Sequence, residues 1–248
     1  MSSGPGSSTS LSLRRFRISL LIGAVIVASL LLLWLRSSSL SMTRALPTER
    51  LNHEATYQII TLGLFGLFVV LAMTLGGRAV LRYLNPTRFS GPVTPVPWIG
   101  LRPKAGEGWV AVGSSFLMVI TLVTAIVVYL PVHRSGSFAF SITGVLLPAL
   151  VFALTNSLVE EGIYRFAVTS VFLENGFSAT SAAFTSGLLF GGVHFFGTPG
   201  GVAGVFLAGF LGWFLSKSIA ETQGFGWAWL IHFAQDLVIF VALLGTDL

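Results

Sequence analysis

The chain contains no cysteine and few charged side chains, and both shortages restrict what it can be. Without cysteine it can form no disulfide, no cysteine-ligated zinc site and no thiol nucleophile, although this leaves the compartment undetermined. Charged residues make up only 9% of the 248 residues, whereas soluble domains contain about a quarter. Because 54% of the chain is hydrophobic, its apolar surface exceeds what a soluble core would bury. The bilayer is therefore the expected solvent.

Apolar runs long enough to cross a bilayer recur along the whole chain. A hydrocarbon core about 30 Å thick requires about 20 apolar residues in a helix. The expected spans are residues 18–35, 57–75, 109–130, 137–175, 179–196, 202–216 and 227–244. The run at 137–175 is twice the length of one crossing, and Pro148 with the polar stretch 155–157 predicts a kink or break. The predicted fold class is all-α, a polytopic bundle of about seven transmembrane helices with one long kinked helix.

Polar segments between these runs divide the chain into three parts. Residues 1–15 begin with a stretch rich in serine and glycine and are expected to form a disordered N-terminal tail. Residues 16–136 hold the N-terminal transmembrane helices and a basic, proline-rich linker at 76–108. Residues 137–248 form the predicted catalytic membrane core.

The distribution of lysine and arginine predicts the orientation in the membrane. Three arginines precede the first span and five cations lie in the 76–108 linker, against four in the first and third loops. The positive-inside rule then places the N-terminus in the cytoplasm. No basic patch is interleaved with aromatic residues, so no nucleic-acid partner is expected. We expect a multi-pass protein of a prokaryotic cytoplasmic membrane, with the lipid bilayer as a partner.

Glu174, Lys217 and Glu221 are expected as charges at span ends in the interface, whereas six other ionisable side chains in the last apolar runs are not explained in this way. They are Glu160, Glu161, Arg165, His194, His232 and Asp236. An ionised group in a membrane helix costs several kcal/mol unless it pairs, faces a wet cavity or takes part in chemistry. These residues are therefore the candidates for a functional site.

The first candidate motif is the pair of glutamates followed by an arginine. On a helix Glu161 and Arg165 lie at positions i and i+4 and can pair, while Glu160 is turned about 100° away. We interpret Glu161 and Arg165 as structural support, and Glu160 as a free carboxylate suited to general-base catalysis. A buried ion pair without any chemistry explains the same pattern.

Two further motifs carry histidine. His194 follows Phe190 by four residues, and His232 precedes Asp236 by four. The second spacing suits a carboxylate that orients an imidazole, or two ligands of one metal ion. Taken singly, both motifs also fit polar contacts that hold membrane helices together.

Together and in this order, the three motifs resemble those of the CPBP family of intramembrane proteases. That pattern is Glu-Glu-x3-Arg, then Phe-x3-His, then His-x3-Asn or Asp. The matching residues are Glu160, Glu161, Arg165, Phe190, His194, His232 and Asp236. The family includes CAAX prenyl endopeptidases of the Ras-converting type and Abi-like, bacteriocin-processing or immunity homologues. The resemblance covers roughly residues 148–244, and the first 140 residues contain no motif that we can place.

The resemblance implies hydrolysis of a peptide bond inside the bilayer by a glutamate-activated water. Glu160 with His194 would activate the water, and His232 with Asp236 would stabilise the oxyanion. Glu161, Arg165 and Phe190 would support the site. Asp236 stands where the best-described members have asparagine, and an ionised aspartate cannot donate a hydrogen bond. It must then be protonated or serve to orient His232.

We expect catalysis without a metal or other cofactor. The alternative within the same resemblance is a zinc site, with Glu160, His194, His232 and Asp236 as the plausible ligands.

The leading functional hypothesis is an endopeptidase that cleaves near the C-terminus of a membrane-embedded or lipidated substrate, such as a prenylated CAAX protein. One alternative is a catalytically silent, immunity-type protein that binds a peptide, although all three motifs are intact. Another is a proton-coupled transporter, although the candidate proton carriers cluster in one half of the chain and no internal repeat stands out.

Overall fold

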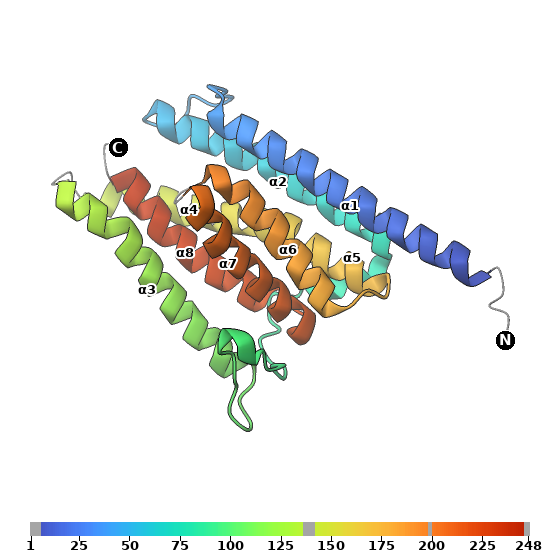
Figure 1. The fold of residues 1–248 in the computed structure, drawn as a ribbon. Coiled ribbons are helices and arrows are strands. Elements are labelled where there is room, and N and C mark those ends of the chain that lie inside the picture. Colours follow the sequence, from blue (N-terminus) through green and yellow to red (C-terminus); the bar gives the residue numbers. More distant parts are fainter. Residues whose placement is uncertain (1–5, 136–141, 198–199, 246–248) are drawn as a thin grey trace.

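The computed structural model describes residues 6–135, 142–197 and 200–245, and this part of the chain is helical (Figure 1). Its α-helices are α1 (Gly6–Ser37), α2 (Glu49–Gly76), α3 (Trp109–Ser135), α4 (Ile142–Glu160), α5 (Val168–Glu174), α6 (Ala179–Val193), α7 (Gly201–Thr222) and α8 (Gly226–Gly245). The shorter elements are the 3₁₀ helices η1 (Arg78–Leu84), η2 (Pro97–Ile99) and η4 (His194–Phe196), and the π-helix η3 (Glu161–Ala167). The prediction of an all-α bundle is confirmed.

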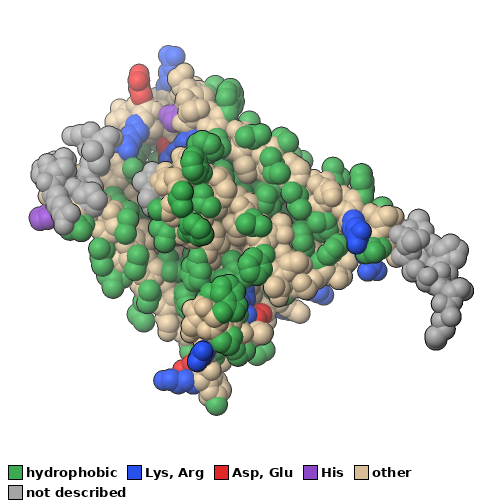
Figure 2. Space-filling view, viewed as in Figure 1, with side chains coloured by type: hydrophobic (Ala, Val, Ile, Leu, Met, Phe, Trp, Pro, Cys, Tyr) green, Lys and Arg blue, Asp and Glu red, His purple; other side chains and the backbone are tan. Residues whose placement is uncertain are grey.

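Six segments of the described residues are long and apolar enough to cross a membrane. They are Ser10–Ser37, Glu49–Gly76, Trp109–Leu130, Gly144–Glu174, Gly201–Thr222 and Gly226–Gly245. The expected span at residues 179–196 is not among them; it corresponds to α6, which has only 15 residues. Figure 2 shows hydrophobic side chains over the middle of the molecule, with lysine and arginine mainly toward its ends. This surface is the one that a multi-pass membrane protein presents to lipid.

The long helical element that carries the glutamates runs from α4 through η3 into α5. Of the kink or break expected at Pro148 and residues 155–157, the break is absent, because α4 continues through all four positions. The Ser157 hydroxyl donates to the Ala153 carbonyl at 2.7 Å, and the Thr155 hydroxyl lies 2.7 Å from Gln58 Oε1 of α2 and 2.9 Å from the Val151 carbonyl. Both hydroxyls have hydrogen-bond partners without a break in the helix. The departure from α-helical geometry comes later, at the π-helix that begins at Glu161.

The described structure begins inside the N-terminal segment that was expected to form a tail. A disordered tail is expected through residue 15, whereas α1 begins at Gly6. Residues 1–5 lie outside the described residues. Figure 1 shows α1 beside α2 on one side of the bundle, while α3 lies on the other side along α8.

The two basic segments lie at the same end of the bundle. The Arg17 guanidinium near the start of α1 donates to Asn175 Oδ1 at 3.4 Å, in the turn between α5 and α6. Arg82 of η1 forms an ion pair of 2.6 Å with Glu174 in that region. The N-terminal arginines and the linker after α2 therefore face one side, as the charge distribution requires.

Candidate active site

A fully buried ion pair forms the base of the site. Arg165 Nη1 lies 3.2 Å from Glu161 Oε1, and both side chains have no exposed surface. The Arg165 guanidinium carbon lies 3.5 Å from the centre of the Phe190 ring, which adds a cation–π contact. The expected partnership of Glu161 and Arg165 is therefore present. Both residues belong to η3, and π-helical segments frequently occur at functional sites.

Glu161 also holds His232, a contact that the sequence did not suggest. His232 Nδ1 lies 2.6 Å from Glu161 Oε1, and because a carboxylate only accepts, the imidazole N–H donates. This bond turns Nε2 of His232 toward Glu160 Oε2 at 3.6 Å and Asp236 Oδ1 at 3.5 Å. Three carboxylates thus surround one buried imidazole.

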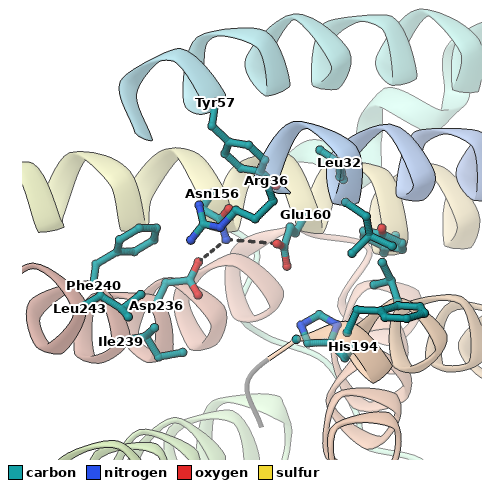
Figure 3. A pocket seen from close by; sticks show the side chains of 15 residues that line it. Leu32, Arg36, Tyr57, Asn156, Glu160, His194, Asp236, Ile239, Phe240 and Leu243 are labelled. Atoms are coloured by element: carbon teal, nitrogen blue, oxygen red, sulfur yellow. Dashed lines mark hydrogen bonds between the residues drawn. The ribbon is translucent and has the colours of Figure 1, made fainter. Parts of the chain in front are cut away.

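Asn156 joins the two carboxylates that lie nearest to His232 Nε2. Its amide nitrogen donates to Glu160 Oε1 at 3.2 Å and to Asp236 Oδ2 at 3.0 Å (Figure 3). Asp236 accordingly accepts a hydrogen bond in this arrangement. Sequence reasoning used Asn156 only as a sign of a kink. The signal that would have found it is its position one helical turn before Glu160.

His194 enters the site from the end of α6. Its Nδ1 lies 2.9 Å from the Phe190 carbonyl, which can only accept, so Nδ1 carries the proton and Nε2 of the neutral ring is an acceptor. The centre of the Phe190 ring lies 4.1 Å from that of His194 and 5.9 Å from that of His232. Phe190 therefore packs between the two histidines and the buried arginine.

A cavity of about 200 Å³ opens in front of these groups. Glu160, His194, Asp236 and Asn156 line it, as Figure 3 shows. His232 is not a lining residue, but its Nε2 lies 3.6 Å and 3.5 Å from the lining carboxylates of Glu160 and Asp236. The opposite wall comes from Leu32, Leu33 and Arg36 of α1 and Tyr57 of α2. The N-terminal part of the chain, in which no motif was placed, thus contributes directly to the site.

The structure brings all seven sequence-predicted residues into one neighbourhood. In the described part of the chain no group of three or more His, Cys, Asp or Glu side chains has an arrangement that would hold a metal ion. The zinc alternative, with Glu160, His194, His232 and Asp236 as the candidate ligands, is tested by the chelator experiment described below.

Comparison with known proteins identifies the family. Residues 142–238 match a family model described as Type II CAAX prenyl endopeptidase Rce1-like. No curated protein and no solved structure matches the chain. The matched segment contains all seven motif residues, so the resemblance seen in the sequence is confirmed. Residues 142–238 therefore match the CPBP family of intramembrane proteases.

Proposed function

We propose that the protein is an intramembrane endopeptidase of the glutamic type, in which Glu160 activates a water molecule. The observation that carries this proposal is that Glu160 and His194 line one cavity, both with acceptor atoms available to a water. The family match supports a hydrolase that acts on membrane-associated proteins. The role of each side chain is the one that the resemblance to the family implies, and the contacts described above support it.

In the first step the water oxygen attacks the carbonyl carbon of the scissile peptide bond. Glu160 takes the proton, and His194 Nε2 accepts the second hydrogen of the same water in a hydrogen bond. Asn156 fixes the Glu160 carboxylate by its 3.2 Å hydrogen bond, so the base is held in place before the substrate arrives. The product of this step is a tetrahedral intermediate with a negative oxygen.

In the second step the carbon–nitrogen bond breaks and the proton moves from Glu160 to the leaving amine. We assign stabilisation of the oxyanion to His232, whose Nε2 donates when the ring carries a second proton. Glu161 would orient this ring through the 2.6 Å bond to Nδ1. Asp236, which accepts from Asn156, would orient Nε2 rather than donate to the oxyanion.

The proposed substrate class is based on the family description, which names CAAX prenyl endopeptidases. We propose a membrane-associated, prenylated substrate cut near its C-terminus. A purified protein that cleaves a farnesylated CAAX peptide faster than its unprenylated counterpart would support this class. Equal rates would show that the lipid is not recognised.

The decisive experiment compares Glu160→Gln with wild type in detergent or liposomes. Cleavage should fall by about 10²–10⁴-fold, the usual contribution of a general base, while thermal unfolding changes little. Glu49→Gln is the matched control because Glu49 is exposed at the start of α2. A variant that still cleaves at the wild-type rate would overturn the proposed role of Glu160.

The same preparation tests the competing hypotheses. A silent binder would retain peptide affinity and show no cleavage even as wild type, and a transporter would show proton-coupled uptake in vesicles. Treatment with a strong chelator followed by dialysis should leave cleavage unchanged if no metal takes part. Loss of activity that added zinc restores would favour the alternative site.

A further inference from the structure

Arg36 occupies the mouth of the cavity. It lies one residue before the end of α1, and its Nη1 donates to Glu54 Oε2 at 2.6 Å. Its guanidinium carbon also lies 5.2 Å from the centre of the Tyr57 ring. The side chain is nevertheless 47% exposed, and the bond to Glu54 uses one of the five guanidinium N–H donors. The guanidinium therefore keeps donors for a ligand.

A series of buried, hydrogen-bonded side chains fixes the position of Arg36. Glu54 Oε1 accepts from Gln58 Nε2 at 2.8 Å, and Gln58 Oε1 accepts from the Thr155 hydroxyl at 2.7 Å. Glu54 and Gln58 are only 7% and 3% exposed, and buried polar groups in a membrane protein are costly unless each finds a partner. This series connects the cavity mouth to α4, the helix that ends in Glu160.

The charges around the cavity are divided between its two walls. Among the described residues that line it, Arg36 is the only lysine or arginine, while Glu160 and Asp236 are carboxylates. An anionic ligand end is repelled by the two carboxylates and attracted to Arg36. A guanidinium binds a carboxylate through two parallel hydrogen bonds, so this arrangement selects both charge and orientation.

We propose that Arg36 binds the free C-terminal carboxylate of the peptide substrate. This inference rests on the proposed function and deepens it. If Arg36 holds the C-terminal carboxylate, the number of residues between that carboxylate and the scissile bond determines which peptide bond lies at Glu160, in addition to any lipid on the substrate. Glu54 is then a positioning residue for Arg36. A phosphate of an anionic lipid headgroup offers similar chemistry, and the test separates the two sources.

The test uses one peptide in two forms, with a free C-terminal acid and with a C-terminal amide. Wild type should cleave the acid with a kcat/KM about 10–100-fold higher than the amide, the range of a charge-assisted hydrogen-bonded pair. Arg36→Gln should bring this ratio close to one, and Arg36→Lys should give an intermediate ratio because it lacks the planar fork. Arg44→Gln, an exposed change in the loop before α2, should keep the wild-type ratio.

A binding measurement keeps the inference independent of catalysis. Glu160→Gln should bind the acid peptide more tightly than the amide, and the added Arg36→Gln change should remove the difference. Acid preference in binding without any cleavage by wild type would uphold this inference and overturn the proposed function. Equal cleavage of acid and amide by wild type would uphold the proposed function and overturn this inference. A third outcome is that wild type cleaves acid and amide equally fast, and that anionic phospholipid inhibits wild type but not Arg36→Gln. Arg36 would then bind the lipid headgroup, and this inference would be overturned.

Discussion

Asn156 keeps two like charges together at the centre of the site. Its amide nitrogen donates to both Glu160 and Asp236, whose carboxylates would otherwise repel each other. Hydrogen bonds to charged groups contribute about 1.5–3 kcal/mol each. A side chain that looks inert in the sequence therefore controls the position of the proposed base.

We expect Asn156→Ala to lower kcat/KM by about 10–100-fold, because each lost bond to a charged group corresponds to about that factor. Asn156→Asp should be worse, since it places a third carboxylate between Glu160 and Asp236. Peptide cleavage by purified variants measures both. Ser115→Ala is a suitable control because its hydroxyl bonds a carbonyl of its own helix. Wild-type kinetics in Asn156→Ala would refute this role.

The buried pair of Glu161 and Arg165 should be a stability determinant. Arg165→Met leaves the Glu161 carboxylate buried without its cation, which costs about 3–5 kcal/mol for an internal ion pair. The double variant with Glu161→Gln should recover part of this loss, because the unpaired charge is gone. Thermal unfolding in detergent measures both.

The exposed pair of Arg82 and Glu174 provides the comparison, since Arg82 has 46% of its side chain exposed. Arg82→Met should cost no more than about 1 kcal/mol. If Arg165→Met unfolded no more easily than Arg82→Met, the buried pair would not be the support we describe.

Helices α6 and α7 approach each other through glycine. A Cβ atom built at Gly191 would lie 2.6 Å from the Val205 carbonyl oxygen, and one at Gly187 would lie 2.7 Å from the Gly209 carbonyl oxygen. Small residues allow membrane helices to pack at such short separations. This crossing positions the end of α6, from which Phe190 and His194 reach the site.

Two adjacent glycines make a matched test of that crossing. Gly191→Ala should destabilise the protein by about 1–3 kcal/mol, because the added methyl group meets backbone that cannot move aside. Gly192→Ala should be neutral, since nothing lies within 4 Å of its added Cβ. The midpoint of thermal unfolding distinguishes the two variants. Equal midpoints would show that the crossing tolerates a side chain.

The length of α6 also explains how the two histidines meet. Fifteen α-helical residues rise about 22 Å, less than the hydrocarbon thickness of about 30 Å. The helix therefore ends before it has crossed the bilayer. His194, just after α6, can lie level with His232, seven residues into α8. An apolar run in the sequence does not show where along it the helix stops.

The whole molecule has one basic end, where the start of α1 and the linker after α2 meet the turn between α5 and α6. The cavity lies toward the other end, because three of its lining residues come from the last six residues of α1. If the N-terminus is cytoplasmic, as the cation count predicts, the cavity opens toward the outer face.

The absence of cysteine permits a direct test of this orientation. Arg44→Cys in the loop before α2 should react with a membrane-impermeant thiol reagent in intact cells. Lys104→Cys in the basic linker should react only after the membrane is permeabilised. Both side chains are exposed, so accessibility to the reagent depends on the side of the membrane. The reverse pattern would place the N-terminus outside.

By itself the sequence determined the membrane class, the approximate spans and the seven motif residues, because charge is rare in lipid-facing helices and its presence is conspicuous. Only the tertiary structure decided that Glu161 holds His232, that Asn156 joins two carboxylates and that α1 and α2 wall the cavity with Arg36 and Tyr57. Glu161 and His232 are 71 positions apart and Asn156 and Asp236 are 80 positions apart, on different helices. Local pattern carries no information about which helices lie side by side, since that depends on close packing of the whole bundle.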